Sequence, residues 1–152
     1  MAKFTFNGFD TIEASFQQLS ELTAEEKYSV ISQAAELLRQ RFVDKIRSLF
    51  VPRSGALAGS ITIEQKTDDS GIYAHISPKG KHPKSSTGRR NKKGRSSGKY
   101  AGSNAEVAWI LEYGSARIAA RHWMETTNEE SEDDVLAAEE AAWNELLQSK
   151  GL

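Results

Sequence analysis

The stretch that decides the fold runs from Thr23 to Leu49 and reads TAEEKYSVISQAAELLRQRFVDKIRSL. Thr23 followed by Glu26 is a capping-box pair, which typically opens a helix. Pro52 is expected to end the helix, because proline has no amide proton and pushes the residue before it out of helical geometry. The sequence therefore predicts one long amphipathic helix, whose apolar residues recur over about seven turns. The predicted stripe is Tyr28, Ile31, Ala35, Leu38, Phe42, Ile46 and Leu49.

Two short elements are predicted before this helix. The segment from Lys3 to Phe6 alternates polar and apolar residues and stops at the turn pair Asn7-Gly8, which indicates a short strand at a sheet edge. Asp10 and Glu13 repeat the capping-box spacing. Ile12, Phe16 and Leu19 then recur at helical spacing, so we expect a short helix there.

After the long helix the apolar period changes from helical to two. The turn cluster Asp68-Asp69-Ser70-Gly71 separates two alternating runs, and Pro78 follows the second. Gly55 and Gly59 allow the chain to turn sharply into the first run. Residues of about 57 to 77 therefore predict an antiparallel hairpin with one face on the core. Its apolar positions are Ile61, Ile63, Ile72, Ala74 and Ile76.

The C-terminal third predicts two further helices. Ser103 with Glu106 has capping-box spacing, and Gly114 stands where a left-handed C-terminal cap belongs, although the alternation from Val107 to Tyr113 leaves a strand open. The segment from Trp123, rich in Ala and Glu, is expected to be largely helical up to Gly151. The elements together predict an α+β fold, in which a small, mainly antiparallel sheet packs against a long helix and a C-terminal helix.

Composition limits the class of protein. A chain of 152 residues is about one domain. The mean hydropathy is -0.56, and no apolar run approaches the roughly 18 residues that a membrane span needs. The N-terminal residues contain no apolar stretch that could serve as a signal sequence, so we expect synthesis in the cytosol and no contact with a membrane. Because cysteine is absent, disulfides, thiolate metal sites and thiol nucleophiles are excluded.

Charge is segregated along the chain although the net charge is only -1. Nine acidic residues and no Lys or Arg lie from Glu125 to Glu145. Nine basic residues and no acidic one lie from Lys79 to Lys99, which we call the basic segment; residues 79 to 103 are expected to form a mobile loop. It could line a DNA channel, pair with a neighbour's acidic C-terminal segment, or remain solvated. Its cations are Lys79, Lys81, Lys84, Arg89, Arg90, Lys92, Lys93, Arg95 and Lys99.

No catalytic or cofactor-binding pattern is present in the sequence. His75, His82 and His122 show no metal-ligand spacing, so we expect no metal site. The glycines of the basic segment follow no buried strand, and no serine lies in a nucleophile motif. The acidic pairs Asp133-Asp134 and Glu139-Glu140 are typical of a solvated helix face. We therefore expect a protein that is not an enzyme and needs no cofactor.

Two stretches carry a family resemblance. The first is Val51-Pro52-Arg53-Ser54-Gly55-Ala56-Leu57-Ala58-Gly59-Ser60-Ile61. The second is Ile110-Leu111-Glu112-Tyr113-Gly114-Ser115, followed by Ala119-Ala120-Arg121-His122-Trp123-Met124. In order and spacing they resemble segments of the gene-product-ten-like family of phage neck and tail-completion proteins. Where that family often has proline before its aromatic-Met pair, this chain has Arg121-His122, and its basic insert is long.

The resemblance implies an α+β subunit of a long-tailed phage particle, made in the host cytoplasm and located in the virion. Such subunits form a homo-oligomeric ring, commonly of six copies, that joins the head connector or stopper to the tail terminator or tail tube, with genome DNA in the channel. One alternative is a virion-morphogenesis or tail-completion protein at another position. A second alternative is a small nucleic-acid-binding protein that acts through the basic segment.

Aromatic residues near the second stretch are candidates for subunit contacts. Tryptophan is favoured both in cores and as an interface anchor, so we expect at least one of the three tryptophans between subunits. Glu112 and Tyr113 could place a carboxylate and a phenol at a subunit boundary, although core packing of Tyr113 is an equal alternative. The candidate interface residues are Trp109, Glu112, Tyr113, Trp123 and Trp143.

Overall fold

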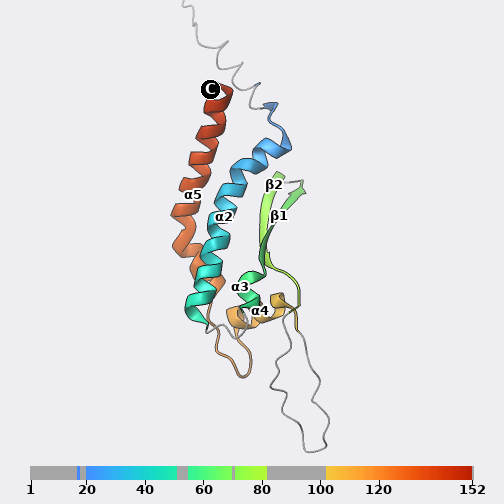
Figure 1. Ribbon diagram of the computed structural model, residues 1–152, viewed down its shortest axis with the longest axis vertical. Helices are drawn as coiled ribbons and strands as arrows, with labels where there is room; N and C mark the ends of the chain where they lie inside the picture. The colour runs from blue at the N-terminus through green and yellow to red at the C-terminus, as the bar shows by residue number, and fades with distance from the viewer. Residues whose placement is uncertain (1–16, 18–19, 51–54, 70, 82–101, 152) are drawn as a thin grey trace, which may run out of the picture.

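The computed structural model describes residues 17, 20–50, 55–69, 71–81 and 102–151. It has the predicted α+β fold, with the elements α2 (Ala24–Leu49), α3 (Ala56–Gly59), β1 (Ile61–Asp68), β2 (Gly71–Pro78), α4 (Asn104–Tyr113) and α5 (Trp123–Lys150) (Figure 1). The predicted N-terminal strand, and almost all of the predicted helix after it, lie outside the described residues. None of the described helices combines the length and the apolar character that a membrane span requires.

The long helix α2 begins at the predicted capping box. The Thr23 hydroxyl accepts the amide proton of Glu26 at 3.2 Å, and the Glu26 carboxylate accepts the amide proton of Thr23 at 2.9 Å. The helix ends at Leu49, because Phe50 has extended backbone angles. Pro52, which was expected to end the helix, lies outside the described residues.

Helix α2 lies between two partners, with α5 on one side and the β-hairpin on the other (Figure 1). It therefore buries more than the single predicted stripe. Val30, Ala34 and Val43 are buried although the stripe omitted them, whereas Leu49, which the stripe included, is 40% exposed. A stripe one residue wide is enough for one neighbour, and a second neighbour requires apolar positions on both sides of it.

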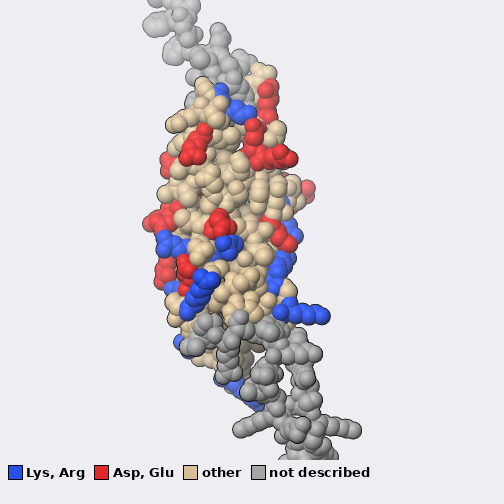
Figure 2. All heavy atoms as spheres, in the orientation of Figure 1, with Lys and Arg blue, Asp and Glu red and all other residues tan. Residues whose placement is uncertain are grey.

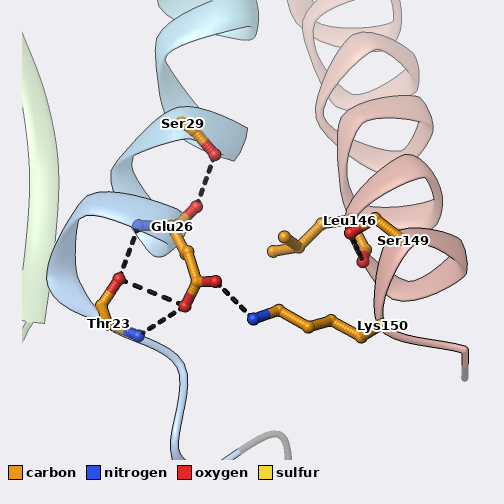
Figure 3. Close-up of polar contacts among 6 residues, drawn as sticks. All are labelled: Thr23, Glu26, Ser29, Leu146, Ser149 and Lys150. Atoms are coloured by element: carbon orange, nitrogen blue, oxygen red, sulfur yellow. Dashed lines mark hydrogen bonds and ion pairs between the residues drawn. The ribbon is translucent and has the colours of Figure 1, made fainter.

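Helix α5 runs antiparallel to α2, and ion pairs set the register between them. Lys45 contacts Glu130 at 2.7 Å and Arg41 contacts Asp134 at 2.7 Å. At the opposite end of the pair, Lys150 in the last turn of α5 contacts Glu26 at 2.5 Å (Figure 3). Exposed pairs of this kind contribute about 0–1 kcal/mol each, so they orient the helices and the apolar contact stabilises them.

The hairpin has the predicted antiparallel register, with Ile63 opposite Ile76 and Asp68 opposite Gly71, and it ends at Pro78 as predicted. The prediction of its start, at about residue 57, was wrong. Residues 56–59 form one helical turn, α3, which buries Leu57 and Ala58, and the first strand begins at Ile61. Leu57 and Ile61 are four residues apart. This spacing puts both side chains on one face in a helical turn and also in a strand, so the pattern alone did not distinguish the two.

The core lies where α2, α3, α4 and the start of α5 meet, at the end of the molecule drawn lowest in Figure 1. Gly55 enters this region with a φ of 64°, as expected for a sharp turn, whereas Gly59 lies inside α3 with no positive φ. The buried cluster comprises Phe42, Val43, Ile46, Leu57, Ala58, Ile61, Ala108 and Trp123.

The contacts of Glu26 predict a pH-dependent loss of stability. Hydrogen bonds from Lys150 and from the Thr23 amide lower the pKa of Glu26 from 4.5 to about 2. A lowered pKa in the folded state means that the ionised carboxylate stabilises the fold above pH 4.5, and that this contribution is lost as the pH falls towards 2. We expect Glu26→Gln to lower the free energy of unfolding at pH 7, and the difference from wild type to shrink between pH 4.5 and 2 in urea titrations.

Glu25→Gln is the matched control, because Glu25 is exposed in the same turn and has no ion pair in the described part of the chain. A difference between Glu26→Gln and wild type that is as large at pH 2 as at pH 7 would contradict the assignment.

Candidate functional site

Trp123, the first residue of α5, joins three helices. Its side chain is 1% exposed and its ring meets that of Phe42 on α2 edge to face, with centroids 5.6 Å apart. Its indole N–H donates to the carbonyl of Ala108 on α4 at 3.2 Å. A buried Trp with a satisfied N–H both fills a core and fixes the direction of its neighbours. We call this region, residues 109–125, the α4–α5 corner.

Glu112 caps the N-terminus of α5 from a different helix. Its carboxylate is buried, at 3% exposure, and accepts the amide protons of Met124 at 2.7 Å and Glu125 at 3.2 Å. The residue at the N-cap position, His122, makes no side-chain capping bond. Because the first amides of a helix have no partner within it, and because they form its positive end, a carboxylate there is favourable.

Gly114 allows the corner to fold back on itself. Its φ is 82°, positive as predicted, but its ψ of -178° is extended and not that of the expected left-handed cap. A Cβ atom here would lie 2.8 Å from the Ala120 nitrogen and 2.9 Å from the Ile118 oxygen. The returning chain donates from the amides of Arg121 and His122 to the carbonyls of Leu111 and Glu112. The end of α4 is therefore satisfied by the residues that lead into α5.

His122 and Glu125 lie beside the Glu112 carboxylate. His122 has a φ of 47°, and its Nδ1 is 3.2 Å from a carboxylate oxygen of Glu125. Together the three residues offer ligand atoms within 4.8 Å of one another, a set that short-range spacing in the sequence did not reveal. The helix amides already use the Glu112 oxygens, and the positive end of α5 opposes a cation. The arrangement is accounted for as a helix cap, and the expectation of no metal site stays a prediction.

An exposed aromatic pair lies on the outer side of α4. Trp109 is 59% exposed and Tyr113 is 62% exposed, and their rings lie 5.3 Å apart at a tilt of 49°. The alternative prediction, that Tyr113 packs in the core, is therefore wrong. Ile118, in the loop that folds back on Gly114, is also 45% exposed. Large apolar side chains exposed together are typical of surfaces that meet another molecule.

The other predicted contact residues are differently placed. Trp123 and Glu112 have almost no exposed surface, and their partners are within the subunit, so their role between subunits stays a prediction with little surface to support it. Trp143 is half-buried on α5.

Of the nine cations of the basic segment, Lys79 pairs with Glu64 at 2.9 Å and Lys81 is exposed. The other seven lie outside the described residues. His75 is exposed on β2, and His82 is not described.

The fold brings the two family-like stretches together. Leu57 and Ile61 from the first stretch and Trp123 from the second belong to one buried cluster, and Met124 packs against it. Comparisons with protein-family models, with curated proteins and with solved structures found no match. The family resemblance consequently stays an expectation from the residues themselves.

The capping role of Glu112 predicts a stability effect. In Glu112→Gln one acceptor remains but the charge is lost and an N–H₂ group faces the helix amides, so we expect a loss of about 1–3 kcal/mol in the free energy of unfolding. The measurement is urea denaturation followed by circular dichroism. Glu129→Gln, at an exposed position of α5 beyond its first turn, is the control and is expected to lie within about 0.5 kcal/mol of wild type. Equal midpoints for the two variants would rule out the cap.

A separate measurement tests the cluster of His122, Glu112 and Glu125 for cation binding. Because its carboxylate oxygens are engaged by amides, we expect the same thermal midpoint with a chelator as with added Zn²⁺ or Mn²⁺. A rise with metal that disappears in His122→Ala would contradict this expectation and assign a cation site.

Proposed function

We propose that this protein is a structural subunit of a long-tailed phage particle, which assembles with copies of itself into a ring at the head-tail junction. The ring joins the head connector or stopper to the tail terminator or tail tube. Six copies are what the family resemblance implies. A related tail-completion or virion-morphogenesis position is the alternative within the same class of protein.

The α4–α5 corner is the observation that carries this proposal. The resemblance rests on residues such as Leu57, Glu112, Gly114 and Trp123, and each of them has a specific structural task at this corner or in the core beneath it. The same corner presents Trp109 and Tyr113 to solvent. A rigid support beneath exposed aromatics favours a binding surface, because little side-chain and backbone freedom is left to lose when a partner binds.

The aromatic pair favours contact with another protein. Two adjacent aromatic side chains that are more than half exposed are costly in water and are favourable as anchors at an interface. They are i and i+4 neighbours on one helix, so they form a single continuous surface. We assign this surface to the contact with a neighbouring subunit or connector.

Assembly of the purified protein tests the role of the aromatic pair. We expect wild type to form a closed oligomer in mass photometry and sedimentation velocity, and the double variant Trp109→Ala with Tyr113→Ala to need about 30-fold higher concentration for half-assembly, as for loss of a 2 kcal/mol anchor. Its unfolding midpoint should stay close to that of wild type, because both rings are exposed.

Tyr73→Ala is the matched control, since Tyr73 is an aromatic residue 42% exposed on the hairpin, away from the corner. We expect it to assemble as wild type does. A wild-type chain that remains monomeric at every concentration, and is absent from purified particles by mass spectrometry, would overturn the proposed function.

A further inference from the structure

The exposed surface of the α4–α5 corner combines aromatic rings with two cations. Trp109 and Tyr113 are more than half exposed, and Ile118 in the following loop is 45% exposed. That loop adds Arg117 and Arg121, and it contains no Asp or Glu. Both Arg side chains are exposed, and neither takes part in an ion pair within the described part of the chain. Trp, Tyr and Arg are the residue types that most often anchor protein interfaces.

A second large apolar side chain is exposed in the middle of α5. Leu136 is 56% exposed, and Trp143, two turns further along the same side of the helix, is half-buried. Thr127 and Ser131, which α5 buries within the subunit, lie on the opposite side. This side of α5 is therefore a partly apolar helix face that no element of the described fold covers. We call it the Leu136 face.

Four carboxylates form the rim of the Leu136 face. Each is three or four residues from Leu136, so the four surround it on the helix surface: Glu132, Asp133, Glu139 and Glu140. All four are exposed, and none takes part in an ion pair within the described residues, where Arg41 and Lys45 bind Asp134 and Glu130 instead. The acids are thus free to meet cations of another molecule.

The corner and the Leu136 face are complementary. Each has an apolar centre with a charged rim, which is the usual anatomy of a protein interface, and the rim is cationic at the corner and acidic on α5. Figure 2 shows acidic side chains along the edge that α5 forms, and Lys or Arg side chains at the lower end of the molecule, where Figure 1 places α4 and the loop after it. Opposite charges on the two rims favour contact of unlike surfaces over contact of like ones.

Within one chain the fold keeps the two surfaces apart. Trp109, Tyr113 and Leu136 all stay exposed, so the corner does not cover the Leu136 face of its own subunit. Leu136 is 13 residues beyond Trp123, which is about 20 Å along the helix axis. The Glu112 cap and the indole N–H of Trp123 hold α4 at the start of α5. Contact between the two surfaces therefore requires two copies.

We propose that the α4–α5 corner of one copy binds the Leu136 face of the next copy. Because the two surfaces differ, the contact is head-to-tail, and its repetition closes into a ring when the rotation allows it. Leu136 and the exposed part of Trp143 receive the rings of Trp109 and Tyr113, while the acidic rim pairs with the two Arg residues. This inference rests on the proposed ring and names the surface that receives the aromatic pair.

Charge reversal at each rim tests the contact. The corner variant carries Arg117→Glu and Arg121→Glu, and the face variant carries Glu132→Arg and Glu140→Arg. We expect each variant alone to need at least about tenfold higher concentration for half-assembly at low salt, because like charges then face each other. A chain with all four substitutions should assemble within about threefold of wild type, because the rims are again opposite in charge. Sedimentation velocity measures the assembly.

Mixing the two single-surface variants tests directly for contact between copies. In an equimolar mixture the reversed corner of one variant meets the reversed face of the other, and the two unreversed surfaces also match. We expect alternating mixed oligomers in native mass spectrometry, although neither variant assembles alone at that concentration. The matched control reverses Asp69 and Glu145 to Arg, two exposed acids outside the Leu136 face, and is expected to assemble as wild type does.

The outcomes separate this inference from the proposed function. If wild type assembles and both single-surface variants assemble equally well, the contact is overturned while the ring remains. If the corner variant fails to assemble and the fourfold variant does not recover, the corner meets a different surface and the inference is again overturned. The same holds if the corner variant assembles normally but loses binding to DNA. A wild-type chain that does not assemble overturns both proposals. Circular dichroism of each variant establishes that it is folded.

Discussion

The N-terminus of α5 depends on a carboxylate that comes from another helix. His122 at the cap position contributes no side-chain bond, and the amides of Met124 and Glu125 are satisfied by Glu112 of α4. In return, the residues that enter α5 donate to the last carbonyls of α4. Each helix end therefore completes the other, so neither can be displaced without leaving buried polar groups unpaired. Trp123 then fixes this corner to α2 through Phe42.

The parts of the fold that the sequence predicted are those set by local chemistry. Thr23 and Glu26 are three residues apart, and Gly151 ends α5 with the left-handed conformation expected of a glycine cap. Such signals act within one turn and can be recognised without knowledge of the neighbours. The role of Glu112 could not be recognised in this way. Its partners follow a loop whose path depends on the positive φ of Gly114 and on its close approach to Ala120.

Burial was predicted less well than element type, for a related reason. The periodicity of α2 identifies a helix with one apolar side, but the number of neighbours that cover it is a property of the fold. Here α5 and the hairpin both contact α2, and Val30, Ala34 and Val43 are buried in addition to the stripe. The tryptophans illustrate the same limit. Trp109 and Trp123 are equally apolar in the sequence, yet one is 59% exposed and the other 1%. Residue type alone cannot decide between a core and an interface when it suits both.

In the proposed ring, the exposed pair Trp109 and Tyr113 provides affinity, because burial of two aromatic rings against an apolar partner is favourable and nearly insensitive to salt. Both rings stand on α4, the helix whose Glu112 and Ala108 hold the start of α5. The helix that would meet the neighbour is therefore fixed before contact, and little freedom is left to lose on assembly. An apolar patch alone would also allow symmetric pairing, which stops at two copies, so a head-to-tail ring needs a further contact that selects the relative orientation of the subunits.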